Sequence, residues 1–467
     1  MKRQKLRRAL LSSALLSTAL GTPLGVATWL TTSADDTPPT AEQPSSEKTG
    51  SEKSTAESGD KPTEPATAST DGAATGSGEE ERAAIEDKAG SDTGPRDPAA
   101  TGDAQPDIKL VPRRPRETGP SSDGSLANPT ELPLTADAIA RRDRIRRCLN
   151  LYYHDPISVN DHSPWGIMHV LISYGVDTEI FVGERKVNAI GWLCYNGACR
   201  GQRLMYVENG KLRVRIGPGV QGHPGQFLAM LAQSRVRPDY PIRVDGQEFT
   251  VADLIESEKE TCRAKTELTF KLIALSHYLK TDSTWKNDLG EDWSISRLIK
   301  EELAQPVIGA ACGGTHRMTG FSYAVNKRTK MEESFDGQWG RARKFVEDYH
   351  DYLFRLQNSD GSFSTNWFAG RGDWGEAPRR VETTGHMLEW LVCSLSKDQL
   401  DDPRVVQAVD FLTRTLVEGK QQRRKFEVGP RGHALHGLAI YNERRFGDKP
   451  GSRELIFARQ PRETTIR

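Results

Sequence analysis

RKFVEDYHDYLFRLQNSDGSF, the stretch from Arg343 to Phe363, decides the fold class of this chain. A helix with apolar residues on only one face must bury that face against a neighbouring element. The string Asn-Ser-Asp-Gly-Ser then ends the helix, because these residues favour tight turns. The stretch therefore predicts one hairpin of a helical array. Its apolar face consists of Phe345, Tyr349, Tyr352, Leu353 and Leu356.

Helical segments of two kinds alternate along the rest of the chain. Ala138–Tyr153 and the segment around Val409 are apolar on one face, whereas His386–Leu395 and His433–Tyr441 are apolar almost all round. A one-sided helix is half exposed, and a helix that is apolar all round is buried on every side. The alternation predicts outer helices that cover inner ones. Inner helices are expected to begin near Trp165, Gly222, Arg263, Cys312, Gly385 and Gly432.

The helix that ends at Gln357 and the Asp-Gly-Ser-Phe turn after it resemble the QW repeat of the squalene cyclase and protein prenyltransferase superfamily. The resemblance implies an all-α fold, an α/α toroid of about six helix hairpins over residues 134–467. The globular region contains neither the Asp-x-Asp-Asp string of the cyclases nor the Asp-x-Cys pair with which the prenyltransferases hold zinc. We therefore expect the fold of this superfamily without its chemistry.

Short alternating segments predict β-hairpins inserted between the helices. Leu204–Ile216 alternates around Asn209-Gly210, the dipeptide most typical of a type I′ turn. Ile242–Val251 around Asp245-Gly246 predicts a second hairpin, after which Thr250 is expected to cap a helix that begins at Ala252. Glu179–Val187 predicts a third.

The first part of the chain predicts export. Residues 1–34 contain a basic start followed by an uncharged, partly apolar stretch, which fits a signal sequence or a single transmembrane anchor. Residues 35–133 are rich in Pro, Ser, Thr and Glu and predict a disordered linker, because they offer little apolar area to bury. We expect a single-pass protein of the cell membrane with residues 134–467 outside the cytoplasm, or a secreted or periplasmic protein if the signal is cleaved.

Charge and cysteine content limit the partners and the redox chemistry. The net charge of +0 and the pI near 7.2 argue against a nucleic-acid partner. Cys194 and Cys199 flank an Asn-Gly turn, so a disulfide between them is possible outside the cytoplasm. The other cysteines fit small buried side chains.

Histidines recur near the expected starts of the inner helices. If they share one depth, they form a polar site at the end of the helices where the dipole favours anions; the alternative is that each one caps or packs locally. No cofactor or metal is expected, because HExxH and CxxC spacings are absent. Cys312 lies at an expected helix start, where a nucleophilic thiolate is one interpretation. Close packing permitted by the neighbouring glycines is the favoured one. The catalytic candidates are His223, His316, His386 and His436, with Arg317 as a carboxylate-binding residue; His169 and His433 complete the set.

The loop before the fifth expected inner helix contains a second set of candidates. Trp367, Arg371, Asp373 and Trp374 combine aromatic faces with charges, which suits a sugar ring or a peptide. The alternative is a loop packed on itself and held by arginine–carboxylate pairs.

The sequence thus favours a binding or scaffolding role in the cell envelope, towards an unknown envelope protein or glycan, with the membrane reached through the N-terminal segment. An enzyme of the polysaccharide lyase or hydrolase type, with a His-lined central cavity, is the alternative. Lipid or isoprenoid binding comes third.

Overall fold

The computed structural model describes residues 134–447. In this range it contains twelve α-helices and four two-stranded antiparallel sheets, which confirms the predicted all-α class with small β-hairpin insertions. The predicted signal or anchor, the linker and the last twenty residues, 448–467, lie outside the described residues. None of the helices within residues 134–447 combines the length and apolar character that a membrane span needs.

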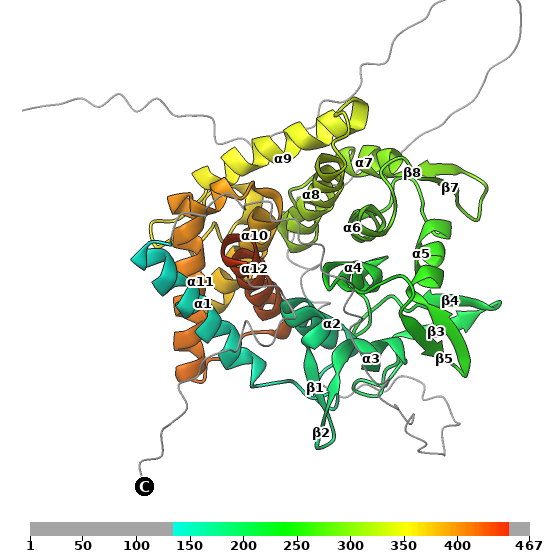
Figure 1. Cartoon of the computed structure of the whole chain (residues 1–467), viewed down its shortest axis with the longest axis horizontal. Coiled ribbons are helices and arrows are strands. Elements are labelled where there is room, and N and C mark those ends of the chain that lie inside the picture. The colour runs from blue at the N-terminus through cyan, green and yellow to red at the C-terminus, as the bar shows by residue number, and fades with distance from the viewer. Residues whose placement is uncertain (1–133, 448–467) are drawn as a thin grey trace, which may run out of the picture. The chain divides into compact units, whose positions relative to one another are not determined.

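Six helices contact one another in cyclic order, α2 with α4, α4 with α6, and so on until α12 contacts α2 (Figure 1). We call them the inner helices. This closed order of contacts is compatible with the predicted toroid. The toroid itself and kinship with the cyclase and prenyltransferase superfamily both stay predictions. The inner helices are α2 (Pro164–Tyr174), α4 (Gln226–Gln233), α6 (Thr269–Tyr278), α8 (Thr315–Lys330), α10 (Ala377–Ser394) and α12 (Val428–Phe446).

The other six helices lie outside this ring of contacts (Figure 1). Each one packs on a neighbouring inner helix; for example, α9 contacts α8, and α11 contacts α10. The longer ones, such as α9 and α11, have polar exposed faces and apolar inward faces, as the one-sided patterns predict, whereas the short α3 is buried almost all round. These outer helices are α1 (Ala136–Tyr153), α3 (Ala189–Cys194), α5 (Val251–Glu260), α7 (Ile295–Leu303), α9 (Gly337–Arg355) and α11 (Pro403–Gln421).

The hairpin turn predicted after α9 is confirmed in detail. The side chain of Gln357 donates to the carbonyls of Gly361 and Arg404, at 3.1 and 2.8 Å, so it links the turn to the start of α11. The carboxylate of Asp360 accepts from the amide and the hydroxyl of Ser362. The five apolar residues of the predicted stripe are all buried. The turn therefore fixes where the chain turns back towards α10.

Three predicted β-hairpins are confirmed. Asn209 and Gly210 both have positive φ, 52° and 74°, as a type I′ turn requires. Thr250 caps α5 as expected, through a capping box with Asp253. The helix begins at Val251, one residue earlier than expected. A fourth hairpin, in which Trp285 and Trp293 pair across the strands, was not predicted. The strands are β1 (Glu179–Val182), β2 (Arg185–Asn188), β3 (Met205–Glu208), β4 (Lys211–Val214), β5 (Pro241–Val244), β6 (Gln247–Thr250), β7 (Thr284–Lys286) and β8 (Asp292–Ser294).

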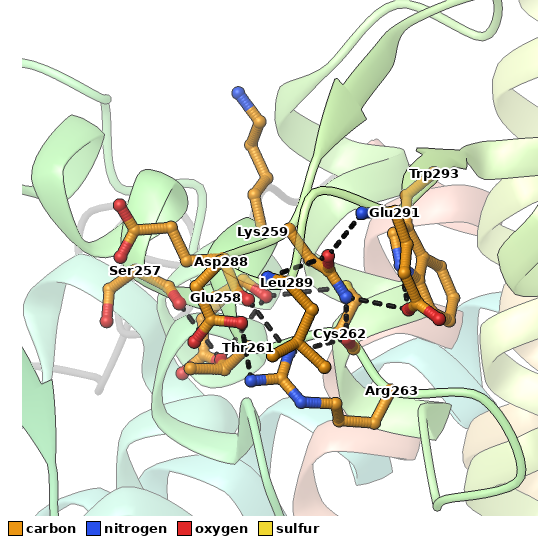
Figure 2. A network of polar contacts seen from close by, with 12 residues as sticks. Ser257, Glu258, Lys259, Thr261, Cys262, Arg263, Asp288, Leu289, Glu291 and Trp293 are labelled. Carbon is orange, nitrogen blue, oxygen red and sulfur yellow. Dashed lines mark hydrogen bonds and ion pairs between the residues drawn. The ribbon is translucent and has the colours of Figure 1, made fainter.

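Three of the predicted inner-helix starts need correction. Arg263 does not begin a helix; it follows α5, where its guanidinium donates to the carbonyls of Glu260 and Cys262 and to Asp288 (Figure 2). These bonds satisfy carbonyls at the end of α5 that have no intrahelical partner. Gly385 and Gly432 lie inside α10 and α12, which begin at Ala377 and Val428. The sequence suggested starts there because apolar runs begin there, but both helices extend further back through polar residues.

Candidate functional site

Glycines inside α10 and α12 bring three inner helices unusually close together. A Cβ on Gly432 would lie 2.2 Å from the carbonyl oxygen of His169 on α2. A Cβ on Gly385 would lie 2.8 Å from the Cβ of Ala434 on α12. Any larger side chain would push these helices apart. Since a histidine follows each of these two glycines, the close approach also brings their imidazole rings together.

The histidines of four inner helices meet in one buried cluster. Ring centroids lie 4.0 Å apart for His386 and His433, 4.9 Å for His316 and His433, 5.3 Å for His316 and His386, and 5.2 Å for His169 and His433. Their exposed fractions, together with that of His436, lie between 2% and 7%. We call His169, His316, His386, His433 and His436, with Glu389, the histidine cluster.

Glu389 on α10 is the carboxylate of this cluster, and it hydrogen-bonds directly to two of the histidines. Its two oxygens accept from Nδ1 of His433 at 2.6 Å and from Nδ1 of His436 at 2.5 Å. Burial alone would raise the pKa of Glu389, but the two imidazoles hold that pKa well below its usual range. The bond to Glu389 leaves Nε2 of His433 buried without a hydrogen-bond partner among the described residues.

Cys312 joins two of these histidines at the start of α8. The Sγ of Cys312 and one ring nitrogen each from His316 and His386 all lie within 4.8 Å of one another. Cys312 has a left-handed backbone, with φ 49° and ψ 42°, which is uncommon for a residue with a side chain. Its carbonyl accepts from the Thr315 hydroxyl at 2.8 Å, which fixes this turn.

The surroundings favour neutral forms of these groups. Burial lowers the pKa of His316 and of His386 well below the ordinary value, and His433 beside them lowers it further. Burial raises the pKa of Cys312 to about 12. The proposed effect of the helix dipole, a reactive Cys312 thiolate, is therefore outweighed by desolvation. Neutral imidazoles suit metal ligation better than anion binding, and the Cys312 thiol binds a metal ion as the thiolate, with release of its proton to solvent.

The dipole argument for the histidines also needs correction. His386 lies in the middle of α10 rather than at its start, so its position offers no helix N-terminus to an anion. His316, the second residue of α8, does lie near a helix start. The histidines of the cluster therefore contact one another, but they do not all lie at helix ends.

Two catalytic candidates have other roles. Arg317 is buried and pairs with Glu302 at 2.9 Å, while it also donates to Gln305 and to the carbonyl of Pro306. It is engaged inside the protein and does not face the histidine cluster with a free guanidinium. His223 lies at the edge of the cluster, where it binds Glu267 at 2.8 Å and stacks on Phe270, which in turn contacts His316.

The tryptophan loop divides into two parts. Trp367 packs edge-on against His386, with centroids 5.5 Å apart, and so covers the histidine cluster. Trp374 is 50% exposed, and its indole donates to Asn366 at 2.6 Å. The guanidinium of Arg379 lies between the two indoles, 5.1 Å from the Trp367 ring and 5.2 Å from the Trp374 ring. We call Trp367, Trp374 and Arg379 the tryptophan platform.

Arg371 and Asp373 are exposed beside this platform, and the side chain of Asn366 donates to the backbone carbonyl of Arg371 at 2.8 Å. Two ion pairs also hold the end of the loop at the start of α10: Arg379 pairs with Glu382 at 2.9 Å, and Arg380 pairs with Asp360 at 2.7 Å. Both features weighed from the sequence are thus present: arginine–carboxylate pairs hold the base of the loop, and its tip is exposed.

The cysteines of the described region are free thiols. Cys194 and Cys199 are both buried, so the disulfide considered between them is not formed in this structure. Cys199 instead directs its thiol to the carbonyl of Gly197 at 3.8 Å. Burial raises the pKa of both thiols, which makes them unreactive as they stand.

Comparison with known proteins adds no assignment to this geometry. No protein-family model matches the chain, and no curated protein matches it.

Two important members of the site were not predicted as functional residues, although each has a signal in the sequence. Glu389 follows His386 by three residues in an otherwise apolar helix, a spacing that places both on one face. An acid in such a helix needs a partner, and the His433–His436 pair has the same spacing on the next inner helix. For Cys312 the signal is weaker, because its approach to His386 depends on how α8 and α10 pack.

Proposed function

We propose that this chain is a binding protein of the cell envelope that recognises glycans through the tryptophan platform. The observation that supports this most directly is the contrast in exposure between two parts of the site. Trp374 is 50% exposed, whereas the histidines beneath are 7% exposed or less. A polymer can reach the first group but not the second.

The chemistry of the platform suits sugars. The C–H faces of a pyranose ring pack on an indole, and charged groups at the edge of the ring bind hydroxyls or a carboxylate. Trp374 presents its indole in a fixed orientation because Asn366 holds its Nε1 and Arg379 lies over its face. Little side-chain entropy is then lost on binding. Arg371 and Asp373 supply exposed charges beside it.

The location in the envelope rests on the sequence of residues 1–34, with its basic start and uncharged stretch. A chain anchored or secreted in this way meets polysaccharide as the most abundant polymer outside the cytoplasm.

Binding of purified envelope polysaccharide to the full chain, measured by calorimetry, tests this proposal. Trp374→Ala is expected to weaken binding by roughly tenfold or more, because truncated tryptophan anchors usually cost that much. Leu289→Ala is the matched control, since Leu289 is 67% exposed at the β7–β8 turn, away from the platform. If the native chain does not bind polysaccharide, glycan recognition is ruled out. If both variants bind as tightly as the native chain, recognition through the tryptophan platform is ruled out.

An enzyme remains the second candidate because of one specific observation. Glu389 holds Nδ1 of His433 and leaves Nε2 without a partner, which is how a carboxylate orients a histidine as a general base. Incubation of the full chain with the same polysaccharide, followed by chromatography of the products, tests it. Shortened products that disappear in His433→Gln, while binding persists, favour the enzyme.

A further inference from the structure

Three potential metal ligands converge beneath the tryptophan platform. The ligand atoms of Cys312, His316 and His386 lie within 4.8 Å of one another. In a tetrahedral zinc site, bond lengths of roughly 2.0–2.3 Å place the ligand atoms roughly 3.5 Å apart. Small side-chain rotations are therefore enough to close the three atoms around one ion.

The surrounding hydrogen bonds orient the imidazoles as a metal site requires. Nδ1 of His386 lies 2.7 Å from the backbone carbonyl of Glu382, so it carries the proton and leaves Nε2 as the ligand atom. Ligating histidines usually have such a carbonyl or carboxylate behind them. Among the described residues, no hydrogen bond engages the ring of His316. Both rings thus retain a nitrogen that is free to bind.

A second observation points to an occupant. His433 is 2% exposed, its ring packs against those of His316 and His386, and its Nε2 has no hydrogen-bond partner among the described residues. A buried polar atom without a partner costs free energy, so such atoms are rare unless a ligand or water satisfies them. Glu389 keeps the Nδ1 of His433 protonated, which leaves Nε2 as an acceptor on a ring that contacts both His316 and His386.

We propose that Cys312, His316 and His386 bind one Zn²⁺ ion, with His433, oriented by Glu389, at the fourth position, either as a ligand or as acceptor from a zinc-bound water. One sulfur and two or three imidazole nitrogens form a donor set that zinc prefers, while Mg²⁺ and Ca²⁺ prefer oxygen ligands. This inference goes beyond glycan recognition and does not depend on it.

The test uses the full chain after removal of bound metal with a chelator, and circular dichroism shows whether it stays folded. Native mass spectrometry and competition with a chromophoric chelator measure zinc binding, and Co²⁺ reports the ligands through its tetrahedral spectrum and its thiolate charge-transfer band. One ion per chain and a thiolate band are expected. Absence of stoichiometric binding overturns the proposal.

Variants identify the ligands. Cys312→Ser is expected to lose the thiolate band and roughly 100-fold or more in zinc affinity, and Glu389→Gln roughly 10- to 100-fold, as for other groups that orient ligands. Cys393→Ser is the matched control, because Cys393 is another free, partly buried thiol on α10. If Cys312→Ser and Cys393→Ser give the same band and affinity, Cys312 is not a ligand and the site is wrong.

A folded variant without the site keeps the two proposals apart. His316→Phe retains an aromatic ring against Phe270 and is expected to fold while it loses zinc. Unchanged zinc binding by folded His316→Phe contradicts the ligand set. Loss of zinc by folded His316→Phe supports the metal site, whether or not the chain binds polysaccharide. Trp374→Ala is expected to bind zinc normally.

Discussion

Two groups of buried polar side chains each include a residue of α8, Arg317 in one and His316 in the other, and they differ in how completely they are paired. Between α7 and α8, the carboxylate of Glu302 is fully buried and accepts from the amide of Leu268, the hydroxyl of Thr269 and the guanidinium of Arg317. In the histidine cluster, by contrast, Nε2 of His433 has no hydrogen-bond partner within residues 134–447.

The pairing near α5 follows the first pattern. Lys271 donates to the carboxylate and to the backbone carbonyl of Glu258, at 2.6 and 2.8 Å, and to the hydroxyl of Thr261. Glu258 and Thr261 belong to the larger polar network at the end of α5 (Figure 2), in which Arg263 also pairs with Asp288. A complete network is what stability alone requires, since buried charges are tolerated only when paired. An incomplete one indicates a group that the fold does not supply.

The largest effect is expected where the pairing is complete. Glu302→Ala leaves Arg317 and the Leu268 amide buried without their acceptor, so we expect about 3–5 kcal/mol of lost unfolding free energy. Urea denaturation of the full chain measures it. A loss below about 1 kcal/mol would mean that water replaces the carboxylate and that the network is not structural.

The second-largest loss of unfolding free energy is expected where two inner helices pack closely. Gly432→Ala places a Cβ against the His169 carbonyl, so we expect about 1–3 kcal/mol of destabilisation as α12 moves away from α2. Gly447→Ala is the control, because a Cβ there meets nothing within 4 Å, although its left-handed φ of 80° adds a conformational cost of its own. If Gly432→Ala also weakens zinc binding, the glycine contributes to the site as well as to stability.

Acid should act on a histidine outside the cluster. Burial lowers the pKa of His350 on α9 to about 4, where its ring stacks on Trp390 and meets the Ser394 hydroxyl. The unfolded chain takes up this proton near pH 6.5 and the folded chain does not, so stability falls as pH drops from about 6.5 to 4. We expect His350→Gln to lessen this loss by about 1–2 kcal/mol after allowance for partial exposure. Identical pH profiles would contradict it.

The smallest effect is expected inside the histidine cluster. His316→Phe removes a desolvated imidazole that makes no hydrogen bond among the described residues and keeps its ring contacts, so metal-free stability should change by less than about 1 kcal/mol in either direction. The comparison with Glu302→Ala in the same denaturation experiment decides the point. A loss of about 3 kcal/mol or more would show that the cluster is structural after all.

Most of the fold could be predicted from patterns among residues close in sequence. Most of the site depends on packing between helices that are distant in sequence. The apolar stripe of α9 and the Asn209-Gly210 turn depend on residues close in sequence, so they were predictable. The hairpin at Trp285 and Trp293 was missed because its longer loop lacks a two-residue turn signal.

The site could be predicted only as a set of histidines. Their meeting depends on helix starts and on glycine contacts between α2, α10 and α12, which a single sequence does not state. The ion pair that engages Arg317 could not be predicted for the same reason, because its partner Glu302 belongs to a different helix. Cys312 reaches His386 through a left-handed turn that its residue type does not suggest.

The contact between α12 and α2 also bears on the order in which this protein can assemble. It joins segments near opposite ends of the described chain, and the hydroxyl of Ser173 donates to the carbonyl of Gly432 across the seam. Joining such distant segments is entropically costly and comes late in folding. During synthesis, the faces of α2 and α10 that pack on α12 stay uncovered until Val428–Phe446 emerges. The last helix made thus completes both the hydrophobic core and the histidine cluster.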